Sequence, residues 1–312
     1  MEINKESCFI SVVIYIHNDA EIITKTLKTI SQTLSTYFQN IELICVDDAS
    51  TDNSIDQIQQ SAHNIPVASV SLIQMGHYHG VEKSMSAGVD KAIGDFVFEI
   101  DNATVDYNPL LLINIYKKAL EGYDIVSASP NKAPTHSKLF YKLLSSAGSN
   151  NYSLITETIR ILTRRAINRI GGTNKNIFYR KIAYATSGLK TENITYPPNN
   201  SKRKKSNRKS RLARRHLAID TIIIFTNLAF KISITLSIIM AAFMFTAGIY
   251  TIIAYFAGEN IMEGWAPIMG LISAGFTGVF LILTALIKYF DIMIKQTFYQ
   301  RNYLISSIDE LK

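Results

Sequence analysis

Carboxylates gather directly after two apolar runs of the sequence. Asp47, Asp48 and Asp52 form the first group, among several hydroxyl side chains. Asp101 and Asp106 form the second. Carboxylates can accept hydrogen bonds from a base or a ribose, or coordinate a divalent cation that bridges phosphates. Asp52 can equally cap a helix that begins nearby. The adjacent pair, by contrast, requires a cation or hydrogen-bond donors to offset its mutual repulsion.

The elements that would position these acids alternate along the chain. Apolar, β-rich runs lie at 9–16, 41–46, 67–73, 95–100 and 123–127. Segments with helical periodicity lie between them at 20–38, 54–63, 80–92 and 109–121. This alternation predicts an α/β fold with a mostly parallel sheet and helices on both of its faces. Ligands bind such sheets at the carboxyl ends of the strands, where both acidic groups are expected.

The positive charge of the chain is local. The 312 residues include 32 basic and 25 acidic side chains, for a net charge of +7. Nine of the basic residues lie in 202–215, and without them 23 basic residues face 25 acidic ones. Basic residues confined to one band, without interleaved aromatics, argue against nucleic-acid binding and favour the surface of an anionic membrane.

Two uncharged segments predict a membrane anchor. Residues 232–257 and 265–287 carry no charge, and each is long enough to cross a bilayer. The acidic turn 258–264 separates them, and basic residues flank their outer ends. The positive-inside rule then places both termini in the cytosol. Small residues recur in both spans, which leaves open either plain membrane composition or packing in a homo-oligomer.

These segments predict a soluble-type domain followed by a membrane anchor and a short tail. Residues 1–200 would form a cytosolic catalytic domain, and 201–231 basic helices lying on the membrane interface. Residues 232–290 would form two transmembrane helices, and 291–312 a cytosolic tail. The N-terminus does not resemble a signal peptide, which agrees with a multi-pass protein of the plasma (inner) membrane.

Three sequence blocks and the two apolar spans together resemble the polyprenyl-phosphate glycosyltransferases. The blocks read SVVIYIHND, IELICVDDASTDNS and GVEKSMSAGVDKAIGDFVFEIDNATVD. This inverting family includes dolichol-phosphate-mannose synthases and bactoprenol glucosyltransferases. The resemblance implies a GT-A-type fold, a UDP- or GDP-sugar donor, and a polyprenyl-phosphate or other lipid-linked acceptor at the cytosolic membrane face.

The resemblance also assigns nucleotide-binding residues. The turn after the first strand keeps the family's asparagine at Asn18 and has Asp19 in place of its glutamate. Asp47 and Asp48 match the acidic pair that contacts base and ribose. Glu82 matches the acid of the family's glycine-rich stretch that begins at Gly80.

The catalytic acids match the family only in part. Asp101 matches the first acid of its D-x-D motif, which implies a bound Mg²⁺ or Mn²⁺, and Asp106 is a third acid five residues further on. The second acid of the motif is Ala103 in this sequence. One metal-binding carboxylate is therefore missing, which leaves two alternatives: a low metal affinity, or a shell completed by another group such as Asp106.

Basic residues that would contact phosphate or acceptor follow the acids. Arg160 and Arg164 fall where the family has an R-L-x-D-R run, although the acids of that run are replaced by threonines. Lys202, Arg203 and Lys205 fall near a further phosphate-contacting segment.

The sequence therefore predicts an inverting glycosyltransferase that uses a nucleotide-sugar. The altered D-x-D motif leaves an alternative from another class, a catalytically weak or inactive homologue that serves as a membrane scaffold. A nucleotidyltransferase is disfavoured, because no lysine-containing, glycine-rich phosphate loop lies near the N-terminus.

Overall fold

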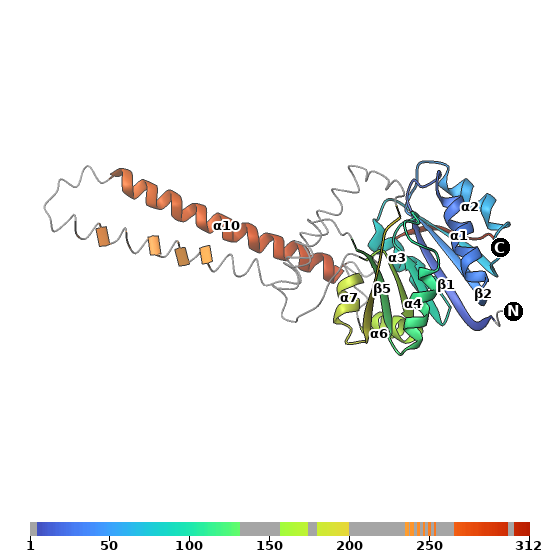
Figure 1. Ribbon diagram of the computed structural model, residues 1–312. Helices are drawn as coiled ribbons and strands as arrows, with labels where there is room; N and C mark the ends of the chain where they lie inside the picture. The colour runs from blue at the N-terminus through green and yellow to red at the C-terminus, as the bar shows by residue number, and fades with distance from the viewer. Residues whose placement is uncertain are drawn as a thin grey trace. The chain divides into compact units, whose positions relative to one another are not determined.

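The computed structural model describes residues 5–131, 157–173, 180–199, 265–298 and 303–312, with scattered positions between 235 and 253 (Figure 1). The chain divides into two compact units. One unit contains a β-sheet and includes the C-terminal residues Gln300–Lys312. The other contains helix α10, Trp265–Phe298.

Strands and helices alternate through the sheet-containing unit, as the sequence predicts. Its strands are β1 (Glu6–Ile16), β2 (Phe38–Asp47), β3 (Ser69–Met75), β4 (Phe96–Ile100), β5 (Ile125–Pro130), β6 (Ile159–Thr163), β7 (Thr191–Tyr196) and β8 (Ile305–Glu310). Its helices are α1 (Ile23–Ser35), α2 (Ser54–Ala62), α3 (Val81–Lys91), α4 (Leu111–Leu120), α6 (Arg164–Thr173) and α7 (Arg180–Thr186).

The described strands form one sheet in the order β7-β5-β6-β4-β1-β2-β3-β8. Strands β3, β2, β1 and β4 run parallel to one another, and β7 runs parallel to β5. Strand β6 pairs antiparallel with both β4 and β5, and β8 pairs antiparallel with β3. The predicted α/β fold with a mostly parallel sheet is confirmed.

Helices cover both faces because the central strands are apolar on both sides. In β1, Ile10, Val12 and Ile14 pack into the cluster that contains the apolar faces of α1 and α4. Val13 points the other way and packs with Met85 of α3. Successive residues of a strand face opposite sides of a sheet, so one continuous apolar run supplies both layers. Both layers are part of the core that fixes the strand ends.

The sequence analysis assigned no strand or helix to several segments that are regular in the structure. Strand β6 carries a buried arginine, which interrupts its apolar pattern. Strand β8 lies within 291–312, which the sequence analysis treated as a tail. It alternates apolar and polar residues over only six positions and is largely exposed at the sheet edge. The predicted interfacial helices at 201–231 lie outside the described residues.

The second unit bears on the predicted membrane anchor. Counting only residues whose side chains the structure describes, no helix combines the length and the hydropathy that a membrane crossing requires. The first predicted span, 232–257, falls almost wholly outside those residues, and the second coincides with part of α10. The two spans are thus not supported by the described part of the chain, and they stay a prediction.

Candidate active site

The chain segments that follow β1, β2 and β4 meet at one edge of the sheet. These three strands are parallel neighbours, so their carboxyl ends lie on the same side. Asn18 and Asp19 follow β1, Asp48 follows β2, and Asp101 follows β4. In the sheet, β2 and β3 lie on one side of β1 and β4 lies on the other. The strand order therefore reverses at β1, which makes this edge a topological switch point. The fold therefore gathers the predicted acids where ligands bind such sheets.

Asp48 is held by three protein donors and is fully buried. Its Oδ1 accepts a hydrogen bond from the backbone N–H of His79 at 2.7 Å. Its Oδ2 accepts from the N–H of Gly80 and from the hydroxyl of Tyr15, both at 2.8 Å. Burial beside Asp48 raises the pKa of the Tyr15 hydroxyl, which therefore stays protonated and donates. Asp48 thus links β1, β2 and the loop before α3.

Asp47 has a buried carboxylate oxygen with no protein partner. Its Oδ2 accepts from the N–H of Ser50 at 3.0 Å, whereas Oδ1 has no hydrogen-bond partner. Burial raises the pKa of this carboxyl above its ordinary value. A buried acceptor without a donor is costly, and such groups occur preferentially at binding sites. Asp47 is therefore the acid of this group with spare capacity for a ligand donor.

The turn after β1 is joined to the turn after β2 by side-chain hydrogen bonds. The Asn18 side-chain oxygen accepts from the Thr51 N–H at 2.7 Å. Asp19 Oδ2 accepts from the N–H of His17 at 3.0 Å. Asp52 accepts from the N–H of Ala20 at 3.1 Å and from the N–H of Ser54 at the start of α2, also at 3.1 Å. Asp52 therefore contributes at least to the helix terminus and to the joining of these turns.

Two buried arginines hold Asp101. Glu99 and Asp101 are two residues apart on one extended segment, so they share a face. Arg160 donates to Glu99 at 2.5 Å and to Asp101 at 2.9 Å. Arg180 donates to the same two acids at 2.6 and 2.8 Å. Tyr184 adds a 2.7 Å hydrogen bond to Glu99. Each carboxylate is thus bridged by both guanidinium groups in a nearly dry setting.

The electrostatics of this cluster keep Asp101 ionised. Burial alone would raise the pKa of Asp101, but the charges of Arg160, Arg180 and Lys181 outweigh it and hold the pKa below its ordinary value. The same acids raise the pKa of both arginines against the opposing effect of burial. Asp101 and both arginines are therefore charged together.

The residues present do not fit a divalent cation at Asp101. Both of its carboxylate oxygens already accept hydrogen bonds from guanidinium groups, whose positive charge opposes a cation. Ala103, at the position of the missing acid, is buried. Within the described residues no group of three or more histidine, cysteine, aspartate or glutamate side chains is arranged to hold a metal. The described residues therefore show an ion-pair cluster at Asp101, and the metal site there stays a prediction that they do not support.

Glu82 and Asp106 have different hydrogen-bond partners near this edge. Glu82, in the first turn of α3, accepts hydrogen bonds from the backbone N–H and the side chain of Arg180 at 3.0 and 3.2 Å. Asp106 accepts a hydrogen bond from the hydroxyl of Tyr196 at 3.3 Å. The structure thus joins Glu82 to the cluster around Asp101, and Asp106 to the end of β7.

The predicted phosphate-binding residues are separated by the fold. Arg160 and Arg164 lie at opposite ends of β6. Arg164 donates to the carbonyl oxygens of Ala92 and Gly94, before β4 begins, and so lies at the far edge from Asp101. The fold therefore does not bring these two arginines together, and their contact with phosphate or acceptor stays a prediction. Lys202, Arg203 and Lys205 lie outside the described residues.

Several site residues were missed by the sequence analysis. Glu99 could have been noticed, because it is a charged residue inside an apolar strand and stands two positions before Asp101. Arg180 and Tyr184 carry no such signal, since α7 is short and far away in the sequence. His79 contributes through its backbone N–H, which sequence patterns do not reveal.

The sheet and the acids at its strand ends define the class of this protein: an α/β fold of the GT-A type. The chain belongs to glycosyl transferase family 2, whose family model matches residues 11–186. This match spans the segments that carry all the described acids of the site.

Relatives and solved structures agree with this assignment. The glycosyltransferase YkcC of Bacillus subtilis, itself uncharacterised, is 24% identical over 286 residues, covering 89% of this chain and 86% of its own. An undecaprenyl-phosphate 4-deoxy-4-formamido-L-arabinose transferase of Proteus mirabilis is 33% identical over 117 residues, covering 38% of this chain and only 35% of its own. The glucosyl-3-phosphoglycerate synthase of Mycobacterium tuberculosis, solved with Mn²⁺ and UDP-glucose, has a TM-score of 0.52 at 13% identity, covering 70% of this chain and 79% of that one.

Proposed function

We propose that this chain transfers a sugar from a UDP- or GDP-sugar to polyprenyl phosphate, or to another lipid-linked acceptor, at the cytosolic face of the plasma membrane. The observation that carries the proposal is the convergence of Asn18, Asp19, Asp47 and Asp48 at the switch point of a family 2 sheet. The similarity to a transferase named for undecaprenyl phosphate supports the acceptor class.

The donor nucleotide is assigned to the turns after β1 and β2. The unpartnered Oδ1 of Asp47 suits an N–H or O–H donor of a base or ribose. Asp48, Asn18 and Asp19 hold the surrounding turns through their hydrogen bonds, and so fix the shape of the pocket edge. Asp47 is therefore the residue proposed to contact the nucleotide directly.

The proposed reaction is a single displacement with inversion. An oxygen of the acceptor phosphate forms a bond to the anomeric carbon from the face opposite the leaving group. The bond between that carbon and the diphosphate oxygen breaks, and the nucleoside diphosphate departs with the electron pair. A phosphate nucleophile is already ionised and needs no general base. Alignment of the reactants supplies much of the rate, so rigid turns around the donor are useful.

No cation takes part in this proposal. Mg²⁺ or Mn²⁺ at Asp101 was the expectation from the sequence, but the two arginines hold that carboxylate. Neutralisation of the leaving group is assigned instead to the basic residues Lys202, Arg203 and Lys205.

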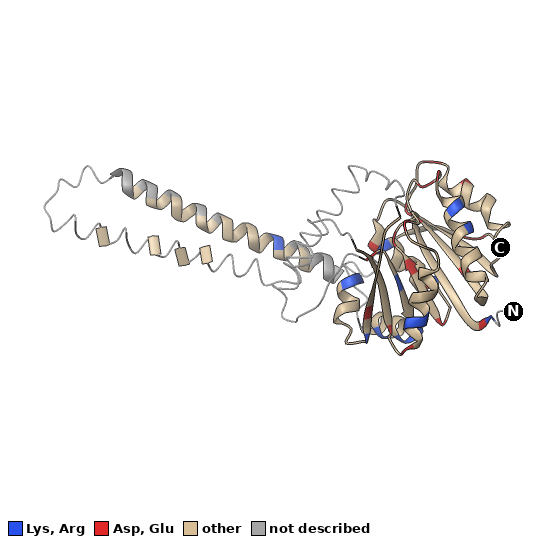
Figure 2. Cartoon of the chain, in the orientation of Figure 1, with Lys and Arg blue, Asp and Glu red and all other residues tan. Residues whose placement is uncertain are grey.

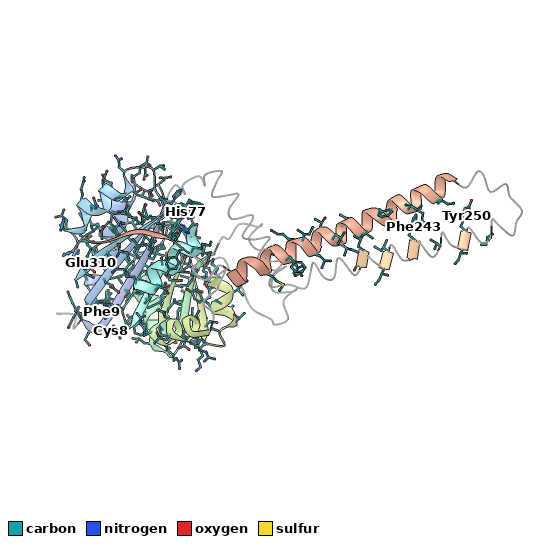
Figure 3. The ribbon with its side chains drawn as sticks, turned by 180° about the vertical axis from the view of Figure 1, so that it is seen from behind. Cys8, Phe9, His77, Phe243, Tyr250 and Glu310 are labelled. Carbon is teal, nitrogen blue, oxygen red and sulfur yellow. The ribbon has the colours of Figure 1, made fainter. Side chains whose placement is uncertain are left out.

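The membrane location rests on exposed apolar residues in the second unit. On α10, large apolar side chains such as Ile272, Phe276, Ile287 and Phe290 are between 46% and 69% exposed. In Figure 2 the described part of this helix is mostly tan, whereas charged residues are spread over the sheet-containing unit. Phe243 and Tyr250, labelled in Figure 3, are exposed as well. Apolar surface of this extent is typical of contact with lipid or with another protein.

The test is transfer of radiolabelled sugar from a panel of UDP- and GDP-sugars to undecaprenyl phosphate, in membranes that contain the full chain. Asp47→Asn keeps the shape of the side chain and removes its charge, and we expect it to lower transfer by about tenfold or more. Glu121→Gln is the matched control, because Glu121 is exposed and pairs only with Lys118 among its described contacts. Transfer that persists with a chelator supports the whole proposal.

The inactive-homologue reading remains a second candidate, favoured by the occupation of Asp101 and by Ala103. The same assay separates the two. Retained binding of the nucleotide-sugar without transfer to any lipid acceptor would favour the scaffold, whereas transfer that requires Mn²⁺ would refute the cation-free reading alone.

A further inference from the structure

The last residues of the chain are bound along the free edge of β3. Strand β8 pairs with β3 from Ser71–Glu310 to Met75–Ile305. Just before β8, the carbonyl oxygen of Leu304 accepts a 2.9 Å hydrogen bond from the N–H of Gly76. Glu310 of β8 forms a 3.7 Å ion pair with Lys91. Figure 3 labels Glu310 on this strand, and His77 on the loop that follows β3.

The imidazole of His79 joins this C-terminal segment to the loop before α3. Its Nε2 lies 3.1 Å from the backbone nitrogen of Leu304, which donates. Its Nδ1 lies 2.5 Å from the carbonyl oxygen of His77, which can only accept. Nδ1 therefore carries the proton and Nε2 presents a lone pair, so the geometry describes a neutral imidazole.

The backbone of the same residue holds the acidic site. The N–H groups of His79 and Gly80 donate to the two oxygens of Asp48, at 2.7 and 2.8 Å. The third donor to this buried carboxylate is the hydroxyl of Tyr15. His79 thus contacts the C-terminal segment with its ring and Asp48 with its main chain.

We propose that His79 is a positioning residue through which the docked C-terminal strand sets the conformation of the donor site, so that protonation of its ring weakens nucleotide-sugar binding. The inference rests on the proposed function, in that the Asp48 turn is taken to border the donor nucleotide. Protonation places a hydrogen on Nε2, which then faces the N–H of Leu304. That hydrogen bond is lost, and the loop 77–80 loses its side-chain link to the C-terminal segment.

The surroundings of His79 agree with this direction. Burial lowers the pKa of the imidazole below its ordinary value of 6.5, and the hydrogen bond to the His77 carbonyl oxygen opposes this. The His77 ring, whose centroid lies 3.9 Å from that of His79, and Lys83 of α3 also lower the pKa. Asp48 at the end of β2 acts in the opposite sense. From the C-terminal segment Tyr303 donates to Asp90 of α3. Because the folded pKa lies below 6.5, the hydrogen bond to Leu304 is intact above pH 6.5 and is lost as the pH falls through that lower folded pKa.

The experiment uses the purified full chain in detergent and UDP-glucose and GDP-mannose as probes. Both lack the terminal phosphate that titrates near neutral pH, so their own charge stays constant. Affinity is measured at about pH 7.5 and about pH 5, on either side of the histidine range. We expect the dissociation constant of the wild type to rise about threefold to tenfold at the lower pH, as loss of one hydrogen bond implies.

Three variants give the readout that a merely structural role would not produce. His79→Gln keeps an acceptor for Leu304 and cannot titrate, so it retains affinity at high pH and flattens the profile. Leu304→Pro removes the N–H donor, so its affinity is low at both pH values. His63→Gln is the control: it replaces an exposed imidazole at the end of α2, away from the 77–80 loop, and leaves the profile unchanged.

Hydrogen–deuterium exchange of the peptides spanning 76–81 and 303–312 tests the link without any ligand. Exchange is corrected for its intrinsic pH dependence. Faster exchange in both peptides at low pH, in the wild type but not in His79→Gln, supports the inference even if neither nucleotide-sugar binds. Absence of binding by both nucleotide-sugars would count against the proposed function alone. An identical pH response in the wild type and His79→Gln, in binding and in exchange, would overturn it.

Discussion

Replacement of Arg160 by methionine is expected to destabilise the sheet-containing unit by about 3–5 kcal/mol, because it leaves buried carboxylates short of positive charge. Arg160 is fully buried and donates to Glu99 at 2.5 Å and to Asp101 at 2.9 Å. A hydrogen bond to a charged group contributes about 1.5–3 kcal/mol, so two such bonds give about 3–6 kcal/mol. Arg180 and Tyr184 still donate to Glu99, which favours the lower part of that range.

Methionine is the appropriate replacement, since its unbranched side chain fills the space of the arginine stem without a charge. The measurement is native-state hydrogen exchange of the full chain, read at the slowest amides of β1 and β4, which reports the free energy of opening of this unit alone. Arg165→Met is the matched control. Arg165 also binds a carboxylate with two hydrogen bonds, to Asp124 at 2.7 Å each, but its side chain is 71% exposed.

The control is expected to cost less, because solvent screens the exposed guanidinium and its buried partner Asp124 keeps hydrogen bonds from Thr163 and Lys190. The contrast between the two variants therefore compares a buried guanidinium group with an exposed one. If Arg160→Met opens with a free energy within about 1 kcal/mol of the wild type, or equal to that of Arg165→Met, the cluster is not the ion-paired core described here.

Three further predictions concern the same unit. Asp101→Asn is expected to be less stable than the wild type. Because the pKa of Asp101 is held below its ordinary 3.8, the difference in stability is full above that pH and shrinks as the pH falls through the lower folded pKa. The measurement is the free energy of unfolding as a function of acid pH. Affinity for UDP-glucose, measured by calorimetry, is the same with excess chelator as with Mn²⁺, and strong dependence on the cation would contradict the arginine-held Asp101. Gly94→Ala is expected to lower the free energy of unfolding by about 1–3 kcal/mol or more, because a Cβ atom there would lie 2.6 Å from the Ser11 nitrogen. Gly171→Ala on α6, where a Cβ atom would meet open space, is the control and is expected to be neutral or slightly stabilising.

The sequence by itself determined the order of the first strands and helices and the acids at their ends. Apolar periodicity is a local property, and the runs at 9–16 and 41–46 correspond to β1 and β2 within a few residues. Because ligands bind such sheets at the carboxyl ends of parallel strands, the sequence also predicted that the acids after β2 and β4 would lie at the binding edge.

Only the tertiary structure decided how those acids are used. Arg180 reaches Asp101 across 79 positions of sequence, and the N–H of Leu304 reaches His79 across 225. Such contacts depend on the order and register of the strands, which local periodicity does not specify. The sequence could therefore suggest a cation at Asp101, whereas the fold brought two guanidinium groups to that carboxylate. It could treat 291–312 as a tail, whereas the open edge of β3, with unpaired backbone groups to satisfy, made its last residues a strand of the sheet.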